Sequence, residues 1–281
     1  MPCHPRGGLG SLPTDAEILA LFFTLKGLTY MELSVGARTD VGMVRSGNED
    51  SVFAEADPRR GVFVVADGMG GHAAGEVASE MAVQIICRYL LPLEHVRDEA
   101  SGEQMAESLR DANRTIYARM LAEVDKKGMG TTASCLVLSE NQYLIGQVGD
   151  SRIYLLRDGV LRQVTKDHSF VQEQMDAGLL TPEQARRHPY SNVITRCVGS
   201  HESVEVDLYR GDAVPGDVFL VASDGLTGMV DDRRLQQILL AQSTAGRIVD
   251  ALVAEANGRG GIDNITAIVI QVGAVLAPTA T

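Results

Sequence analysis

Residues 62–82 read VFVVADGMGGHAAGEVASEMA, an apolar run that ends on Asp67 and leads through a glycine-rich loop into a helical pattern. The apolar run is typical of a buried strand, because it is short and bounded by turn residues. In residues 75–91 apolar side chains recur every three to four positions, which predicts a helix with one face on a sheet. The stretch therefore predicts a strand, a loop and a covering helix. Turn geometry explains the glycines, but it gives no reason for His72 in the loop.

Six further apolar or alternating runs predict strands, at residues 132–139, 142–150, 152–164, 203–210, 217–224 and 264–272. In the third run, Asp158-Gly159 separates two alternating segments, which indicates a two-residue hairpin and a largely antiparallel sheet. Two more helical patterns occupy residues 108–124 and 244–258. Long apolar strands of this kind are covered on both faces. We therefore expect an α+β protein in which two packed antiparallel sheets lie between outer helices.

The composition allows one large domain or two small ones, and it argues against several kinds of partner. The chain has 281 residues, 45% of them hydrophobic, and a formal net charge of −12. Nucleic-acid binding rests on clustered Lys and Arg, so we expect no nucleic-acid partner. The run ILALFF at Ile18 is far shorter than the roughly 20 residues of a membrane-spanning helix. Acidic residues precede it where a signal peptide is basic. We expect no membrane anchor and a cytoplasmic protein.

Four aspartates stand at strand ends: Asp67, Asp150, Asp224 and Asp263, the last followed by Asn264. Taken singly, each is best explained as a turn residue. If the strand ends converge, like charges about 4 Å apart repel by roughly 4 kcal/mol per pair at an effective dielectric near 20, so a cation must lie between them. No Lys or Arg cluster and no zinc-like spacing of His or Cys is present. The pattern therefore indicates an all-oxygen site for Mg²⁺ or Mn²⁺.

Two neighbouring segments add to this site. Gly68 directly follows the first aspartate, and without a side chain its backbone carbonyl can approach an ion. The loop at residues 42–51, GMVRSGNEDS, contains Arg45, Glu49 and Asp50. Alone, such a loop is best explained as a solvated face. Beside a metal site, the arginine suits phosphate oxygens and the acids suit the water around a metal.

Eight segments, in order along residues 36–272, resemble the metal-dependent protein phosphatases, also called protein phosphatase 2C, in their bacterial single-domain form. The segments are GMVRSGNED, VVADGMGGHAAGE, GMGTTAS, VGDSRIYLLRDG, TKDHSFVQEQMDAG, NVITRCVG, LVASDGLTGMV and GIDNITAIVI. The resemblance implies a four-layer β-sandwich of two antiparallel sheets, each covered by a pair of helices. We expect a catalytic domain at residues 31–273 with a flap at about 165–200. A weakly structured extension, residues 1–30, precedes it, and a tail, residues 274–281, follows it.

The resemblance also implies how the metals are held. Asp67 would bridge two Mn²⁺ or Mg²⁺ ions, and the Gly68 carbonyl would bind one of them. Asp224 and Asp263 would bind the other ion. Asp150 matches a position linked with a third, weaker metal.

The remaining site residues match positions around the metals and the phosphate. Arg45 matches the phosphate-binding arginine. Glu49 and Asp50 match acids around the metal waters, with Asn264 beside them. His72 matches the proposed general acid, which protonates the departing serine or threonine oxygen. This role explains the histidine in the glycine-rich loop.

The implied activity is one-step hydrolysis of phosphoserine and phosphothreonine in proteins by a water activated at two metals, in opposition to bacterial serine/threonine kinase signalling. Phosphoproteins, among them such a kinase and its substrates, are the implied partners, and we expect a monomer. No Cys-x5-Arg arrangement is present for a phosphocysteine route. The flap either contacts the substrate or is a surface hairpin with no part in recognition.

Two alternatives compete with this interpretation. GMGGHA at residues 68–73 fits the dinucleotide fingerprint Gly-x-Gly-x-x-Gly/Ala after a strand. Against it, Asp67 would face the pyrophosphate, and no second strand that ends in an acid follows at the required distance. The other alternative is a phosphatase-like domain kept for binding without catalysis. Every position matched to metal or chemistry retains a competent residue, which counts against it.

Overall fold

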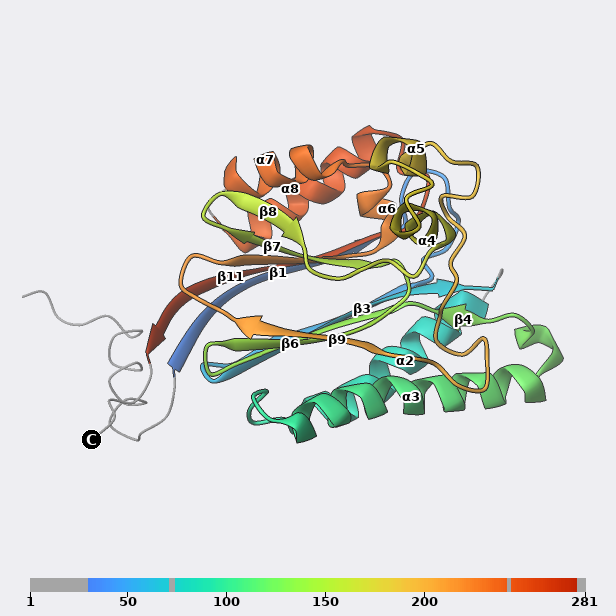
Figure 1. The fold of residues 1–281 in the computed structure, drawn as a ribbon, viewed down its shortest axis with the longest axis horizontal. Coiled ribbons are helices and arrows are strands. Elements are labelled where there is room, and N and C mark those ends of the chain that lie inside the picture. Colours follow the sequence, from blue (N-terminus) through green and yellow to red (C-terminus); the bar gives the residue numbers. More distant parts are fainter. Residues whose placement is uncertain (1–29, 71–73, 242–243, 277–281) are drawn as a thin grey trace, which may run out of the picture.

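The computed structural model describes residues 30–70, 74–241 and 244–276. Within these residues, two antiparallel sheets pack face to face (Figure 1). The first sheet runs in the order β1 (Tyr30–Asp40), β11 (Ile265–Leu276), β10 (Val218–Ala222), β7 (Arg152–Arg157) and β8 (Val160–Gln163). The second runs in the order β2 (Asp50–Ala56), β3 (Arg60–Met69), β5 (Ala133–Ser139), β6 (Gln142–Val148) and β9 (Asp207–Asp212). The short strand β4 (Gly130–Thr131) pairs with the end of β3.

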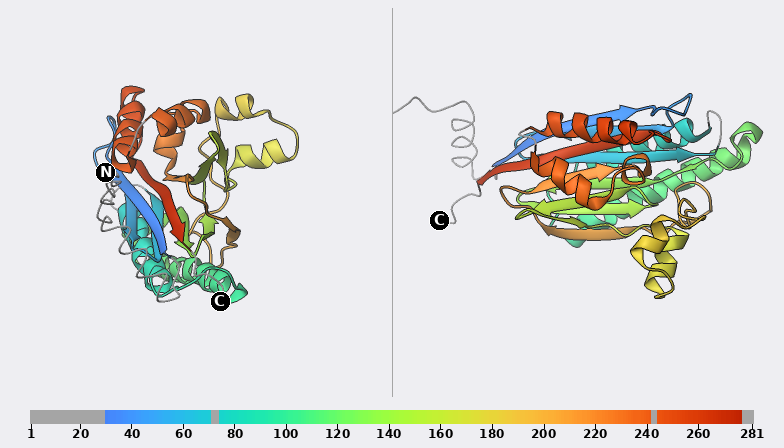
Figure 2. Two further views of the ribbon diagram at one scale, coloured as in Figure 1. Left: turned by 90° about the vertical axis from the view of Figure 1, so that its left-hand side faces the viewer. Right: turned by 90° about the horizontal axis from the view of Figure 1, so that it is seen from above.

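Helices cover the outer face of each sheet (Figure 1). The second sheet carries α2 (Ala74–Leu90) and α3 (Glu99–Ala122), which is followed by the 3₁₀ turn η1 (Val124–Lys126). The first sheet carries α7 (Asp232–Ala241) and α8 (Ala245–Gly258), with the short α6 (Asp224–Thr227) at the end of β10. The predicted flap contains α4 (Phe170–Asp176) and α5 (Pro182–Arg186), which project from the side of the sandwich (Figure 2). This arrangement confirms the predicted α+β fold.

Strand periodicity divides the apolar residues of the described chain among three cores. Along β3, Val62 and Val64 face α2 and α3, whereas Phe63 and Val65 face the other sheet. Along the central strand β10, the side chains likewise alternate between the core beneath the helices and the core between the sheets. Both faces of such a strand are buried, which explains why its sequence is a continuous apolar run. The packing of the two sheets therefore fixes where the central strands end.

The predicted hairpin is confirmed. β7 and β8 pair with Arg157 opposite Val160, and the two residues between them, Asp158 and Gly159, have positive φ angles of 52° and 77°. Positive φ at both central residues is the mark of a type I′ turn, whose twist matches that of the two strands.

Two elements begin four or more residues away from their predicted starts. The helix predicted at residues 108–124 begins at Glu99, where the Asp98 side chain accepts a hydrogen bond from the Ser101 backbone N–H as an N-cap. The first turns of this helix contain mostly small and polar residues, so their apolar periodicity is weak. The strand predicted at residues 203–210 begins only at Asp207.

β1 and β2 have no counterpart among the predicted strands. Each lies at one edge of its sheet, and several of its side chains are exposed. An edge strand buries fewer apolar residues than a central strand, so its sequence pattern is weaker.

The predicted domain bounds stay predictions. The extension at residues 1–30 lies outside the described residues except for Tyr30, which begins β1. At the other end, β11 continues to Leu276. None of the helices in the described part of the chain is both long enough and apolar enough to cross a membrane.

Candidate active site

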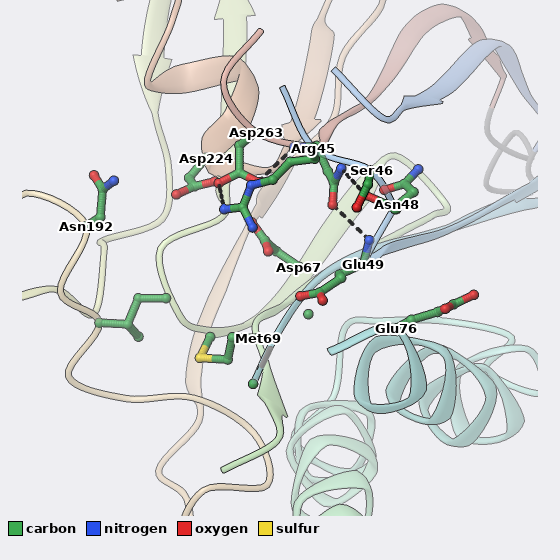
Figure 3. A pocket seen from close by; sticks show the side chains of 15 residues that line it. Arg45, Ser46, Asn48, Glu49, Asp67, Met69, Glu76, Asn192, Asp224 and Asp263 are labelled. Atoms are coloured by element: carbon green, nitrogen blue, oxygen red, sulfur yellow. Dashed lines mark hydrogen bonds and ion pairs between the residues drawn. The ribbon is translucent and has the colours of Figure 1, made fainter. Parts of the chain in front are cut away.

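The ends of the central strands meet at one edge of the sandwich and border a cleft of about 780 Å³ (Figure 3). Its walls come from the loop between β1 and β2, the end of β3, the start of α6, the residues before β11, and the flap. The predicted site residues that line it are Arg45, Glu49, Asp67, Gly68, Asp224, Asp263 and Asn264. The predicted convergence of these segments is thus observed.

Asp67 and Asp224 form the centre of the acidic group. Burial raises the pKa of Asp67 well above its usual value, and the charges of Asp50, Asp224 and Asp150 raise it further. Burial also raises the pKa of Asp224, and the charge of Asp263 adds to the rise. The Asp67 and Asp224 carboxyl groups share a hydrogen bond. Each of the two carboxyl groups therefore makes ionisation of the acidic group less favourable.

The end of β3 is held in place on both sides. The Asp67 backbone N–H donates to Thr132 Oγ1 at 2.9 Å, and the Thr132 N–H donates to the Asp67 carbonyl at 2.9 Å. Gly68 follows, and a side chain at this position would overlap the backbone carbonyl oxygens of Gly75 and Glu49. Only glycine lets β3 pass this close to the start of α2 and to the β1–β2 loop.

Asp50 lies directly opposite Asp67 in the β2–β3 pair and is only 8% exposed. Its Oδ2 accepts a hydrogen bond from Ser223 Oγ at 2.9 Å, whereas its Oδ1 has no partner among the described residues. Burial raises the pKa of Asp50 to about 7, against hydrogen bonds from hydroxyl groups that lower it, and the charge of Asp224 adds to the rise. Asp50 is therefore a buried carboxyl group with one oxygen that has no hydrogen-bond partner among the described residues.

Asp150 follows β6 and is 7% exposed. Burial raises its pKa well above the usual value, the charges of Asp224 and Asp167 add to the rise, and the Arg152 guanidinium opposes it. Its Oδ1 also lacks a partner among the described residues. Asp150 does not line the cleft, but its charge acts on Asp67, so it belongs to the same acidic group.

Arg45 pairs with Asp263 in the cleft. Its Nη2 donates to Asp263 Oδ2 at 2.7 Å, and its charge opposes the rise in the pKa of Asp224. Figure 3 shows the Arg45 guanidinium pointing toward Asp263, with Asp67 and Asp224 beside it. A side-chain cation thus neutralises part of the acidic group.

Asn264 fastens the loop that carries Arg45. Its side chain is buried, and its Nδ2 donates to the carbonyl oxygens of Val41 and Gly47 at 2.9 Å each. Its Oδ1 accepts the Glu49 backbone N–H at 2.8 Å. One side chain, just before β11, therefore holds the β1–β2 loop at three backbone positions.

The acidic group fits the chemistry of a hard cation, although it is not closed around one. Among the described residues, no three His, Cys, Asp or Glu side chains are arranged to hold a metal ion as they stand. The donors are nevertheless all oxygens, as Mg²⁺ and Mn²⁺ prefer. Burial and mutual repulsion disfavour the ionised form of these carboxyl groups. Asp50 and Asp150 each have a carboxyl oxygen without a hydrogen-bond partner among the described residues. A cation at Asp263 would compete with Arg45 for this carboxylate.

Four further residues belong to the description of the site. His72, the predicted general acid, lies outside the described residues. The flap contributes Asn192 and Ile194 to the cleft lining, and Figure 3 shows Asn192 across the cleft from the β1–β2 loop. No sequence pattern singles out these two residues, because only the tertiary structure brings the flap to the cleft. Glu76 also lines the cleft. Its position just after the glycine-rich loop could have identified it from the sequence.

Strand directions exclude the dinucleotide alternative. β3 pairs antiparallel with both of its long neighbours, β2 and β5. The dinucleotide fingerprint belongs to a parallel βαβ unit. That alternative is therefore wrong for GMGGHA.

Comparison with known proteins identifies the family. A family model described as protein phosphatase 2C matches residues 44–252. The serine/threonine phosphatase Stp of Listeria innocua is 38% identical over 242 residues, which cover 83% of this chain and 94% of the relative. The crystal structure of the Mycobacterium tuberculosis serine/threonine phosphatase PstP/Ppp is 38% identical with a TM-score of 0.77, and the match covers 86% of this chain and 99% of that one. The catalytic domain of PstP in complex with two manganese ions is 37% identical with a TM-score of 0.77, over 87% and 100%.

This chain therefore belongs to the protein phosphatase 2C family. The predicted family, fold and enzyme class, a metal-dependent phosphatase of phosphoserine and phosphothreonine in proteins, are confirmed. The roles of the individual side chains stay predictions.

Proposed function

We propose that this chain hydrolyses phosphoserine and phosphothreonine in proteins at the cleft with two divalent cations, Mn²⁺ or Mg²⁺. The observation that carries this proposal is the group of carboxyls, from four separate parts of the chain, whose pKa values are raised by burial and by one another: Asp50, Asp67, Asp150 and Asp224. Family membership supports it, since the relatives described above are serine/threonine phosphatases and one holds two manganese ions.

Asp67, Asp224, Asp263 and the Gly68 carbonyl would hold the two ions. Asp67 is the candidate to bridge them, because its carboxyl group interacts with those of Asp50, Asp224 and Asp150. Asp150 would hold a third and weaker ion through its bare Oδ1. When bound, such ions lower the pKa of water and stabilise negative charge on a phosphoryl group.

Arg45 would bind the phosphate of the substrate. A guanidinium group matches two phosphate oxygens as well as it matches a carboxylate. When a cation binds Asp263 and a phosphate binds Arg45, two ion pairs, one for each side chain, would therefore replace the single pair between Arg45 and Asp263. Because Asn264 holds the loop backbone, this exchange needs only a rotation of the Arg45 side chain.

Asp50 and Glu49 would orient water molecules around the ions. Asp50 is held through Oδ2 by Ser223, which leaves Oδ1 to accept a further hydrogen bond. The Glu49 carboxylate lies against Gly75 at the start of α2, where the helix dipole favours an anion.

His72 would donate a proton to the departing oxygen of serine or threonine. Without that proton the alkoxide is a very poor leaving group. The glycine-rich loop after Asp67 carries this histidine, which is consistent with a position near the ions.

Phosphoproteins are the substrates, and a bacterial serine/threonine kinase with its targets is the partner that we propose. The names of the relatives support this choice. A monomeric state and a cytoplasmic location are part of the same proposal.

Phosphate release from a phosphothreonine peptide tests the proposal. We expect release in millimolar Mn²⁺, none in EDTA, and near-total loss for Asp224→Asn, because the amide keeps the shape of the side chain without its charge. Asp158→Asn is the matched control, since this aspartate lies in the β7–β8 turn with a φ that asparagine tolerates.

Each outcome separates two interpretations. No turnover by the wild-type chain at millimolar Mn²⁺ would favour a binding module without catalysis. Wild-type rates in Asp224→Asn would contradict the ligand assignment while leaving the activity itself in place.

A further inference from the structure

His168 is a buried residue of the flap that the proposed reaction does not use. It is 7% exposed and lies two residues before the start of α4. Its Nδ1 accepts a hydrogen bond from the Gly149 backbone N–H at 3.0 Å. In the other direction, the His168 backbone N–H donates to the Gly149 carbonyl at 2.9 Å. One flap residue thus engages both backbone polar groups of the residue that precedes Asp150.

The same imidazole reaches β9. Its Nε2 lies 3.2 Å from Asp207 Oδ2. Arg196 Nη1 lies 3.0 Å from this ring nitrogen and donates to Asp207 Oδ1 at 2.8 Å. Because the Gly149 N–H donates to Nδ1, the neutral ring carries its hydrogen on Nε2 and donates it to Asp207. Burial lowers the pKa of His168, which keeps Nδ1 available as an acceptor.

Further hydrogen bonds hold the turn that carries Asp150. Gln147 Nε2 donates to the Ser151 carbonyl at 2.7 Å, and the hydroxyl groups of Ser151 and Thr132 share a hydrogen bond of 2.8 Å. Gly149 has a φ of +106°, and a side chain there would overlap Thr132. Asp150 Oδ1, by contrast, is buried without a hydrogen-bond partner among the described residues.

His168 also joins the two segments that form the base of the flap. Its carbonyl accepts the Thr195 backbone N–H at 2.9 Å, and the neighbouring residues Ser169 and Ile194 form a β-bridge. Ile194 lines the cleft. The position of one wall of the cleft and the position of Asp150 therefore depend on the same residue.

We propose that His168 is a positioning residue that holds the Gly149 N–H through Nδ1, and thereby sets the affinity of the Asp150 carboxylate for a divalent cation. Through its other contacts it couples this affinity to the seating of the flap. The inference rests on the proposed function in one respect, that Asp150 is a cation ligand.

Two variants of His168 test the roles of the two ring nitrogens separately. His168→Asn places an amide oxygen near the position of Nδ1 and retains the acceptor for Gly149. His168→Gln places an amide nitrogen near the position of Nε2 and retains only the donor to Asp207. His188→Asn is the matched control, because Nδ1 of that flap histidine accepts the Tyr190 N–H at 3.1 Å, within the flap itself.

The measurement is a calorimetric titration of Mn²⁺ into metal-free protein, with the melting temperature in EDTA as a second readout. Asp150→Asn identifies the binding step that belongs to Asp150, because it removes the carboxylate. We expect His168→Gln to weaken that step by roughly 10-fold, the usual effect of losing a group that orients a ligand. His168→Asn and His188→Asn should leave it unchanged. The two His168 variants should melt at similar temperatures in EDTA, because each retains one of the two ring hydrogen bonds.

Two results would overturn the inference alone: wild-type affinity in His168→Gln, or equal losses in the Asn and Gln variants. A wild-type chain that binds no Mn²⁺, or a titration that Asp150→Asn leaves unaltered, would instead overturn the assignment of Asp150 as a ligand, and the inference with it.

Discussion

Arg45 lies among aspartates in one cleft, and its positive charge offsets part of their negative charge. The acidic group has to be neutralised, because its members are buried beside one another. Arg45 supplies part of that neutralisation by pairing with Asp263 at 2.7 Å, and the raised pKa values of Asp67 and Asp224 favour protonation, which removes further negative charge. A divalent cation would replace both.

Arg45→Gln separates phosphate binding from cation binding. The substitution removes a charged hydrogen-bond donor for phosphate, so we expect KM for a phosphothreonine peptide to rise roughly 10- to 100-fold. It also frees Asp263, so Mn²⁺ affinity measured by calorimetry should increase. Arg38→Gln is the control, since Arg38 pairs with Asp250 on the exposed surface. Weaker Mn²⁺ binding in Arg45→Gln would contradict the competition.

His72→Ala tests the proton donor. The loss of rate should be greater on a phosphoserine peptide than on p-nitrophenyl phosphate, because nitrophenolate leaves readily without a proton. Steady-state kinetics on the two substrates under the same metal conditions make the comparison. Equal losses on both would remove the role of His72 as a general acid.

At the scale of secondary-structure elements, the site depends on how closely β3, α2 and the β1–β2 loop approach one another. Gly68 lies at their junction, in contact with the backbone of Gly75 and Glu49. The Gly68 N–H also donates to the Glu49 carbonyl at 3.1 Å. The strand that carries Asp67 and the loop that carries Arg45 are thus joined by backbone contacts.

Gly68→Ala should separate these elements. The added methyl group overlaps backbone oxygens that cannot move aside as a flexible side chain would, so we expect a destabilisation of about 1–3 kcal/mol and a strong loss of activity. Urea unfolding and peptide dephosphorylation measure the two effects. Gly47→Ala is the control within the same cleft, because a side chain there meets no atom within 4 Å. Equal stability of the two variants would contradict the close approach.

The central elements were predictable from the sequence because their burial leaves a strong pattern. Apolar runs that end in an acid predict β3, β6 and β10, and an apolar run that an acid precedes predicts β11, together with the carboxyls that meet there. The edge strands β1 and β2 were missed because partial exposure dilutes their pattern. The pairing of Arg45 with Asp263 joins residues 218 positions apart in the chain. Such a contact, like the seating of Asn192 in the cleft, follows from the tertiary structure and has no local signal.

At the scale of the whole molecule, the packed sheets hold carboxyls together that would separate in a flexible chain. The stability of the sandwich therefore opposes the repulsion within the acidic group. Because of this repulsion, we expect the stability of the metal-free chain to change with pH in the direction opposite to the usual one for carboxyl groups.

The metal-free protein should be more stable in mild acid than above neutral pH. Asp50, Asp67, Asp150 and Asp224 have raised pKa values in the folded chain, so the folded state binds protons more tightly than the unfolded state. Their contribution is therefore lost as pH rises from about 4, the unfolded value, through the folded value, about 7 for Asp50. His168, whose pKa is lowered, acts in the opposite direction. The lowered pKa values of Asp98, Asp176, Asp207 and Glu255 act in that direction too, but at lower pH, where these carboxyl groups titrate.

Melting temperatures in EDTA at about pH 5.5 and pH 7.5 test this sign. We expect the higher value at pH 5.5, and we expect saturating Mn²⁺ to reduce the difference, because the ion replaces the protons. A melting temperature in EDTA that rises between these two values would show that the carboxyls are not forced together.

A crystal structure grown with Mn²⁺, with anomalous scattering to locate the ions, tests the central claim most directly. The account predicts two manganese peaks on either side of Asp67, with oxygens of Asp224 and Asp263 within coordination distance, roughly 2.0–2.6 Å, and Arg45 turned away from Asp263. It would be contradicted by an Arg45–Asp263 pair that persists at saturating Mn²⁺, with no anomalous peak between the aspartates.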